Sequence, residues 1–458
     1  MAEQESAKKP RRKRKVLRAL VVLLVILIAG FAVFRLVLRS KVNSRLAAIR
    51  EAGYPATCAE LDAWYTIPES AENAADTFID SFSYFDAWEE KEERRLLPIA
   101  GEAELPLRTE PLAQETKALI TQYLTDNQQT LELLHRGAAI EYSRYPVDLR
   151  RGFECLLPDI SNISDGAGLL TLEAVIHAEN GKAEQAVDSI TSTFGLARSL
   201  SKEPIIVSQL VRIACQAYAV SAMEHAINKT EFTDEQFVNL SQSLVNAEDP
   251  CAMTRAFAGE RCMGLSAYKM PAAQILQVLY LFDDHTHLFG VLAIWLYRFV
   301  GLADMDLIVY TNVMNDYLKA IQLPPHKSLD AVDVIEENIK EISKIHILLR
   351  FMPGFSRCTT IDVRNAAQLR TAQTGLAIQR YRLATGKLPD SLAELVPTYL
   401  DAVVKDPFDG KDLRYKKLET GFVVYSIGED GSDDGGKERP RKRTGPPASW
   451  DVTFIVQR

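Results

Sequence analysis

Three stretches near the C-terminus organise this chain: Tyr381-Arg-Leu-Ala-Thr-Gly-Lys-Leu-Pro-Asp-Ser-Leu392, Lys405-Asp-Pro-Phe-Asp-Gly410 and Tyr425-Ser-Ile-Gly-Glu-Asp-Gly-Ser-Asp-Asp-Gly-Gly436. The first stretch predicts a helix end, because Gly386 can adopt the left-handed conformation and Pro389 cannot continue a helix. The second has the residues of a tight turn. The third predicts a strand that runs into an acidic, glycine-rich loop.

The segments around these stretches complete a small α+β module over residues 358–458. Apolar residues at helical spacing precede the corner at Gly386. Ser391-Leu-Ala-Glu394 has the spacing of a capping box and predicts a short helix. The apolar runs Leu413–Leu418 and Phe422–Ile427 flank a glycine-containing turn, which predicts a hairpin, and Asp451–Val456 is expected as a third strand.

The N-terminus predicts a membrane anchor. The apolar run Val16–Leu38 follows the almost wholly basic Lys8–Lys15 and is interrupted only by Arg18 and Arg35, near its ends. About twenty apolar residues span a bilayer, and arginines near the ends of a span can reach the headgroups. We therefore expect a transmembrane signal anchor over residues 16–38. A cleaved signal peptide is the alternative.

The basic residues also predict the orientation of the anchor. Positively charged flanks stay on the cytoplasmic side of a membrane. Residues 1–15 are therefore expected to form a cytoplasmic tail, with everything after Arg39 outside. For a bacterial protein, this means a single pass through the inner membrane, contact with inner-membrane lipid, and a periplasmic location for most of the chain.

Residues 39–357 predict a large helical domain. Apolar residues recur at steps of three and four, as in Ile206, Leu210, Ile213 and Ala217, and Thr233-Asp-Glu-Gln236 fits a capping box. Residues 271–321 are unusually apolar, and we expect buried core helices there. A helix lying on the membrane surface is the alternative. The fold class is therefore mostly α: an N-terminal transmembrane helix, a large helical-bundle body and the small C-terminal α+β module.

Composition excludes some functions and leaves others open. The chain of 458 residues has a net charge of −8, which argues against nucleic acid as a partner. Its six cysteines contain no C-x-x-C pair, so a zinc knuckle is not expected. An even number of cysteines permits disulfides in an oxidising compartment without requiring them.

The order of the C-terminal motifs resembles the C-terminal globular half of the major pseudopilins of bacterial type II secretion. In that family a helix ends in a Tyr…Gly-x-(Tyr/Leu)-Pro corner, followed by an Asp-Pro-aromatic turn, a strand that contains Tyr, and a Ser-x-Gly-x-Asp-Gly sequence. The matching residues lie within about the last fifth of the chain: Tyr381, Gly386, Pro389, Asp406, Pro407, Phe408, Tyr415, Ser426, Gly428, Asp430 and Gly431.

The rest of the chain departs from that family. Prepilins have a Gly–Phe cleavage motif just before the apolar helix, with Glu five residues after the cut. Here Gly30-Phe31 lies inside the apolar run and Arg35 occupies the position of that Glu. We therefore expect prepilin peptidase to leave this chain uncut. The helical body of about three hundred residues also separates the anchor from the module, whereas a pilin joins the two in one helix.

The resemblance implies a calcium site in the acidic loop. The family's site implies carboxylate ligands from Asp430, Asp433 or Asp434 and Asp451, with backbone carbonyls near Ile427. Hard oxygen ligands in a glycine-rich loop suit Ca²⁺. A solvated acidic turn is the alternative.

Two simpler metal sites are less well supported by the sequence. An EF-hand is excluded, because its twelfth position, which needs a bidentate carboxylate, would be Arg441. Asp283-Asp-His-Thr-His287 brings two histidines beside two carboxylates, but on a helix the two rings face apart, so a polar junction between apolar helices is favoured. Glu260, Arg261, His177 and His225 are expected to have structural roles.

The sequence favours a non-enzymatic function. It contains no G-x-S-x-G, no Walker A loop and no G-x-G-x-x-G between a strand and a helix. The main hypothesis is a membrane-anchored cell-envelope protein that contacts envelope or secretion proteins. One alternative is a component of a type II secretion or type IV pilus apparatus. Another is an extracytoplasmic hydrolase or metal enzyme with a site on the helical body.

Overall fold

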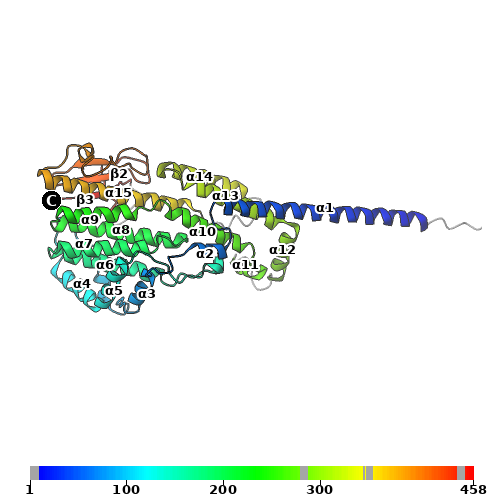
Figure 1. Cartoon of the computed structure of the whole chain (residues 1–458), viewed down its shortest axis with the longest axis horizontal. Helices are drawn as coiled ribbons and strands as arrows, with labels where there is room; N and C mark the ends of the chain where they lie inside the picture. The colour runs from blue at the N-terminus through cyan, green and yellow to red at the C-terminus, as the bar shows by residue number, and fades with distance from the viewer. Residues whose placement is uncertain (1–9, 279–286, 344–345, 347–353, 441–448) are drawn as a thin grey trace, which may run out of the picture.

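The computed structural model describes residues 10–278, 287–343, 346, 354–440 and 449–458. Figure 1 shows an elongated body of packed helices, from which one long helix, α1 (Pro10–Glu51), projects. A small antiparallel sheet lies at the end of the body that is farther from the free end of α1. The predicted fold class is therefore confirmed.

The helix α1 exposes its apolar residues over most of its length. The large apolar side chains between Val16 and Ile28 are each more than half exposed. Only its C-terminal half is partly covered, along a stripe at helical spacing made by Phe31, Arg35, Leu38, Val42, Leu46 and Ile49. Among the described residues, α1 and α8 are long and apolar enough to cross a membrane, but α8 is mostly buried as a core helix. An N-terminal apolar helix compatible with a single membrane span or signal anchor is therefore present.

Short connections join most helices of the body, and some neighbours in the chain, such as α6 with α7 and α7 with α8, pack on one another. The helices α6, α7 and α8 form its centre. The capping box predicted at Thr233 is present at the start of α9. In chain order the helices of the body are α2 (Cys58–Trp64), α3 (Ala74–Phe82), α4 (Gln114–Asp126), α5 (Gln128–Ala139), α6 (Ile160–Glu179), α7 (Ala183–Ser199), α8 (Ile206–Lys229), α9 (Asp234–Ala247), α10 (Ala252–Ala267), α11 (Ala272–Val278), α12 (His287–Val300), α13 (Leu302–Ala320) and α14 (Pro325–Ile342).

The C-terminal module has the elements that the sequence predicts. Gly386 ends its long helix in the left-handed conformation, and Ser391 and Glu394 form the expected capping box. The three strands pair in the order β1-β2-β3, all antiparallel, with Tyr415 opposite Val424 and Val424 opposite Phe454. The elements are α15 (Ser356–Thr385), the 3-10 helix η4 (Leu392–Leu395), β1 (Arg414–Lys417), β2 (Phe422–Ser426) and β3 (Val452–Val456).

The module shares its hydrophobic core with the helical body. Leu376 of α15, Phe422 of β2 and Phe454 of β3 belong to the same buried cluster as Ile190 of α7 and Leu240 of α9. The core therefore continues across residue 358, the boundary suggested by the change in composition.

The outer edge of β3 is also fastened to the body. The side chain of Asn228 on α8 donates to the carbonyl oxygen of Ile455 at 2.9 Å and accepts from the backbone N–H of Gln457 at 2.7 Å. Glu224, one turn earlier on α8, accepts from the backbone N–H of Ile455 at 3.3 Å. These contacts satisfy groups that an edge strand otherwise leaves unpaired.

The expectation that residues 271–321 form buried core helices is correct only in part. Val313, Met314 and Tyr317 of α13 are buried in the core. The preceding helix α12 is different, because Leu292 and Trp295 are more than half exposed. Periodicity alone does not distinguish an apolar face that packs in a core from one that stays outside it.

Candidate functional site

The two C-terminal turn motifs meet at a buried carboxylate, Asp406. Its Oδ1 accepts from the Ser426 hydroxyl at 2.7 Å, and its Oδ2 accepts from the backbone N–H of Ile427 at 3.0 Å and from Arg414 at 2.5 Å. The backbone N–H of Phe408 donates to Oδ1 as well, at 2.9 Å. Because a buried carboxylate is costly unless its oxygens are paired, these bonds fix the start of the acidic loop against the Asp-Pro-Phe turn.

The remaining motif residues hold the corner after α15. The hydroxyl of Tyr381 donates to Glu394 at 2.7 Å, and that of Tyr415 donates to the carbonyl oxygen of Pro389 at 3.0 Å. A residue of β1 is therefore bonded to the corner, and the end of α15 is bonded to η4. Residues that are far apart in the sequence thus form one connected polar framework around the sheet.

Asp451 is the most buried carboxylate of the acidic loop. It is 1% exposed and accepts from the backbone N–H groups of Gly436 at 2.8 Å, Lys437 at 3.2 Å and Asp434 at 3.4 Å. Burial raises the pKa of the Asp451 carboxyl, with a contribution from Asp434, while the N–H bonds act in the opposite direction. Asp451 therefore anchors the returning end of the loop.

Asp434 lies beside Asp451 and has one unsatisfied oxygen. Its Oδ1 accepts from the Ser449 hydroxyl at 2.8 Å, whereas its Oδ2 is buried with no hydrogen-bond partner among the described residues. Two carboxylates that approach one another in a buried place favour either a proton or a cation between them. Of the four predicted calcium ligands, Asp434 and Asp451 are the pair in direct contact, through the backbone N–H of Asp434, and the charge of Asp434 contributes to the raised pKa of Asp451.

Asp430 and Asp433 instead stabilise their own turns. Asp430 accepts from the backbone N–H of Ser432 at 3.1 Å, and Asp433 accepts from that of Gly435 at 3.0 Å and lies 3.8 Å from Arg414. Within the described ranges, no group of three or more His, Cys, Asp or Glu side chains is arranged to hold a metal ion.

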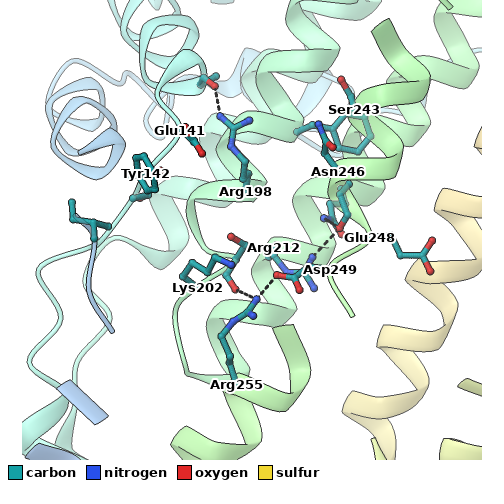
Figure 2. A pocket seen from close by; sticks show the side chains of 18 of the residues that line it. Glu141, Tyr142, Arg198, Lys202, Arg212, Ser243, Asn246, Glu248, Asp249 and Arg255 are labelled. Carbon is teal, nitrogen blue, oxygen red and sulfur yellow. Dashed lines mark hydrogen bonds and ion pairs between the residues drawn. The ribbon is translucent and has the colours of Figure 1, made fainter. Parts of the chain in front are cut away.

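A cavity of about 600 Å³ opens between the helices of the body, as Figure 2 shows. Its walls come from α7, α8, α9 and α10, together with the segments at residues 64–68 and 138–143. Its lining includes the aromatic and apolar side chains of Trp64, Tyr65, Ile67, Tyr142 and Phe194. The charged lining residues are Glu141, Arg198, Lys202, Arg212, Glu248, Asp249 and Arg255.

The arginines of this cavity, which we call the cationic pocket, are held by main-chain carbonyl groups. Arg198 donates to the carbonyl oxygens of Ala138 and Ile140, at 2.8 and 3.0 Å. Arg255 donates to the carbonyl oxygen of Ser201 at 2.8 Å and pairs with Asp249, as Figure 2 shows. These bonds hold the guanidinium groups at the wall of the cavity.

Arg212 is the most deeply placed of the three arginines. It is 2% exposed and donates to Gln209 at 2.6 Å and to the carbonyl oxygen of Ala247 at 3.3 Å. Burial lowers the pKa of Arg212, and the charge of Asp362 acts against this shift. An arginine nevertheless stays protonated at physiological pH, so Arg212 adds a fixed positive charge to the pocket.

The charges of the cationic pocket are not balanced by its own carboxylates. Of these, Asp249 is paired with Arg255, and Glu248 is paired with Arg370 of α15, at 2.5 Å. Arg198 and Lys202 remain on the wall with Glu141, while the charge of Asp362 opposes that of Arg212. An arrangement of this kind suits a ligand that has a negatively charged group joined to an apolar or aromatic part.

A second polar cluster lines a shallower cavity of about 500 Å³, which shares Ala138 and Thr191 with the first cavity. His135 of α5 is within 2.7 Å of the Ser192 hydroxyl through Nδ1 and within 2.7 Å of Glu173 through Nε2. The Ser189 hydroxyl also donates to Glu173 at 2.7 Å, and His177 lies 4.0 Å from it. Serine, histidine and glutamate thus form one hydrogen-bonded chain across three helices.

The charged forms of His135 and Glu173 stabilise one another. Burial opposes the charged form of both His135 and Glu173, but their mutual hydrogen bond prevails, so the pKa of His135 is raised and that of Glu173 is lowered. For His177, burial is the larger effect, and its pKa is lowered. Glu173 is therefore ionised at neutral pH, and its charge favours the protonated ring of His135.

The other residues singled out from the sequence have structural surroundings. Glu260 accepts from the backbone N–H of Ile206 at 3.3 Å, and Arg261 donates to Asn315 at 2.8 Å. His225 lies 3.2 Å from Glu179 in the core. The Asp283–His287 pattern lies outside the described residues, apart from the backbone of His287 at the start of α12. All six cysteines are free.

No match to this chain is found among protein-family models, curated proteins or solved structures. Sequence reasoning missed the cationic pocket and the His135 cluster. Arg212 offered one signal, because a charged residue in a helix that is otherwise apolar on several faces is unusual. His135, Glu173 and Ser192 offered no comparable signal, since they lie on three separate helices.

Proposed function

We propose that this protein is a non-enzymatic, membrane-anchored component of the bacterial cell envelope. Its tail would lie in the cytoplasm, α1 would cross the inner membrane and the body would face the periplasm. One observation carries this proposal. The apolar part of α1 is exposed along its length, while a stripe of side chains on the C-terminal half of the same helix packs on the body. An exposed apolar helix of this length is stable in a bilayer and costly in water.

The C-terminal module is proposed to be a pseudopilin-like head. The contacts of Asp406 with Ser426 and of Tyr415 with Pro389 support the resemblance, because they join motif residues that are separate in the sequence. The unsatisfied oxygen of Asp434 beside Asp451 supports a calcium ion at the loop, which these two residues would hold. A bound ion there would supply positive charge that stabilises the loop.

The proposed role is in protein–protein interaction or envelope assembly. The cationic pocket offers a binding point, since an acidic side chain or a terminal carboxylate of a partner would pair with its free positive charge. Envelope or secretion proteins are the class of partner that this location implies.

Reporter fusions test the topology on which the proposal depends. A reporter that is active only in the periplasm is expected to be active after Arg458 and inactive before Met1. Carbonate washing is expected to leave the full chain in the membrane fraction. The reverse pattern of reporter activity would overturn the orientation, and release by carbonate would show that the N-terminal helix is removed as a signal peptide.

A hydrolase is the second candidate, and the hydrogen-bonded chain of Ser192, His135 and Glu173 favours it. In such a reaction the Ser192 oxygen attacks an ester carbonyl and its proton passes to His135. The departing alcohol then takes that proton, and water releases the acid from the serine. The hydrogen bond with Glu173 raises the pKa of His135 and so favours the protonated ring, which cannot accept the serine proton.

A fluorophosphonate probe distinguishes the two candidates. If Ser192 is a nucleophile, the probe labels the full chain and the Ser192→Ala and His135→Gln variants lose the label. Ser189→Ala is the matched control, because Ser189 bonds to Glu173 but lies outside the bond between Ser192 and His135. Absence of labelling in the folded wild-type protein would remove the hydrolase candidate and leave the non-enzymatic proposal standing.

A further inference from the structure

The helix α12 presents an apolar face that the rest of the body leaves uncovered. Leu292, Trp295, Leu296 and Phe299 follow one another at steps of three, one and three, so they lie on one side of the helix. Each of the four is more than half exposed. Leu302, at the start of α13, is exposed as well. An apolar patch of this kind on a soluble surface marks a contact site.

The opposite side of α12 is tied to the body by polar groups. Arg298 donates to the carbonyl oxygens of Tyr268 and Met270, at 2.8 and 2.5 Å. The hydroxyl of Tyr297 donates to Asp306 of α13. The helix is therefore amphipathic, and its polar residues fix which side it turns outward.

The anchor helix α1 touches α12 within its apolar segment. The rings of Phe31 and Phe299 lie 5.4 Å apart between their centroids. One turn further along α1, Arg35 pairs with Asp304 of α13 at 2.5 Å. Figure 1 shows α12 running across the direction of α1, beside the part of α1 that is near the body. The position of α12 along α1 is thus set by direct contacts.

These contacts determine the depth of α12 relative to a bilayer that contains α1. The segment Val16–Phe34 is roughly 28 Å long at 1.5 Å per residue, which matches the hydrocarbon thickness of a membrane. Arg35, the first charged residue after this segment, then lies at the headgroups. Phe31 is one turn inside that boundary, so Phe299 and the neighbouring face of α12 lie at the same boundary.

We propose that α12 is an interfacial helix whose apolar face, made by Leu292, Trp295, Leu296 and Phe299, inserts into the outer surface of the bilayer crossed by α1. A helix that lies across the membrane normal, with one apolar face, is the geometry of interfacial helices. Trp295, which stacks on Phe299 at 5.2 Å, is of the residue type that concentrates at membrane surfaces. This proposal rests on the membrane anchor proposed above.

Tryptophan quenching by brominated lipid tests the proposal. The full chain is reconstituted into vesicles of phosphatidylcholine and phosphatidylglycerol, with and without bromine on the phosphatidylcholine acyl chains. The wild-type protein has four tryptophans, and we expect bromine to remove the emission of Trp295. The quenched component is expected to disappear in Trp295→Phe, which keeps an aromatic ring against Phe299. It is expected to remain in the control Trp64→Phe, because Trp64 lies on the body.

A variant in the anchor separates failure of this proposal from failure of the proposed function. Val25→Trp places a tryptophan in the middle of the apolar segment Val16–Phe34 of α1, where bromine quenches it if α1 crosses the bilayer. Quenching in Val25→Trp together with an unchanged emission from Trp295 would overturn the interfacial helix and keep the anchor. No quenching at either position would overturn both. Emission from Trp295 that is protected from bromine and also from aqueous iodide would show that a protein surface, such as a second copy of the chain, covers α12.

Discussion

The ring of Phe454 on β3 lies directly against Gly375 on α15. A methyl group on Gly375 would come within 2.4 Å of the ring, a distance that atoms in a folded protein do not adopt. Phe454 belongs to the core that the C-terminal module shares with α7, α8 and α9, and Gly375 is buried. The sheet can therefore approach α15 only because position 375 has no side chain.

We predict that Gly375→Ala destabilises the protein by about 1–3 kcal/mol, because the added methyl group forces the ring of Phe454 and its strand to move. Thermal or denaturant unfolding of the full chain measures this change. Gly168→Ala is the matched control, since Gly168 is also inside a helix but its nearest side-chain atom would be 3.5 Å away, an ordinary contact. The control is expected to be neutral or slightly stabilising. Equal effects of the two substitutions would show that the close approach of Phe454 to position 375 does not determine the loss of stability.

Calcium is expected to stabilise the full chain against thermal unfolding. A ligand that binds only the folded state contributes about 2.7 kcal/mol when its concentration is a hundred times Kd. Melts in millimolar Ca²⁺ and in EGTA are compared for the wild-type protein and two variants. The stabilisation is expected to be lost in Asp434→Asn, because one carboxylate oxygen of Asp434 is buried without a hydrogen-bond partner, and kept in Asp430→Asn, because Asp430 closes a separate turn.

Other outcomes of this experiment have clear meanings. If the wild-type protein melts at the same temperature in both buffers, the loop is a solvated acidic turn. Loss of the stabilisation by calcium in Asp430→Asn but not in Asp434→Asn would instead support the ligand set expected from the family resemblance, which includes Asp430.

A pH-dependent contribution to stability is predicted at Asp362. Burial raises the pKa of this carboxyl to about 6, although Arg212 acts to lower it. Since the ordinary pKa of Asp is about 3.9, the folded state binds the proton more tightly than the unfolded state. This contribution to stability is therefore fully present below pH of about 4 and is lost as the pH rises through about 6.

The Asp362→Asn variant tests this dependence, because Asn cannot ionise. The free energy of unfolding of the variant, relative to the wild-type protein, is expected to rise between about pH 4 and pH 7. Asp401→Asn serves as the control, since Asp401 is exposed on the surface. A constant difference between Asp362→Asn and the wild-type protein across this range would contradict the raised pKa.

The cationic pocket is predicted to bind anions through Lys202. Inorganic phosphate is expected to raise the melting temperature of the wild-type protein, and this increase is expected to fall in Lys202→Gln. Lys202 is preferred to Arg198 for this test, because Arg198 holds the carbonyl groups of Ala138 and Ile140 and its loss would weaken the fold itself. Lys411→Gln is the control, since Lys411 lies on the surface of the C-terminal module, outside the pocket. An identical phosphate effect in all three proteins would exclude this site.

The local features of the fold were predictable from the sequence. The caps at Thr233 and Ser391 and the helix end at Gly386 are present as predicted, because each depends on residues within one turn of the chain. The hairpin and the third strand were predictable for the same reason: alternation and turn residues are local.

The contacts between distant residues were not predictable in this way. The carboxylates of the acidic loop illustrate this, because sequence spacing places Asp430 and Asp433 as near to the site as Asp434. Only the folded loop shows that the first two turn to their own backbone N–H groups. The exposure of α12 was equally hidden, since the same apolar pattern fits a protein core and a membrane surface.

The helix α1 runs without interruption from Pro10 to Glu51, and its last turns are fixed to the body through Leu38, Ile49 and the pair of Arg50 with Glu60. There is accordingly no flexible tether between the apolar segment and the body. A domain joined to its anchor by a flexible linker samples many heights and tilts above a membrane. A domain joined by a continuous helix keeps one height and one tilt. If α1 crosses a bilayer, the sheet at the far end of the body would therefore stand at a constant distance from that bilayer, and a partner would have to present its own surface at that height.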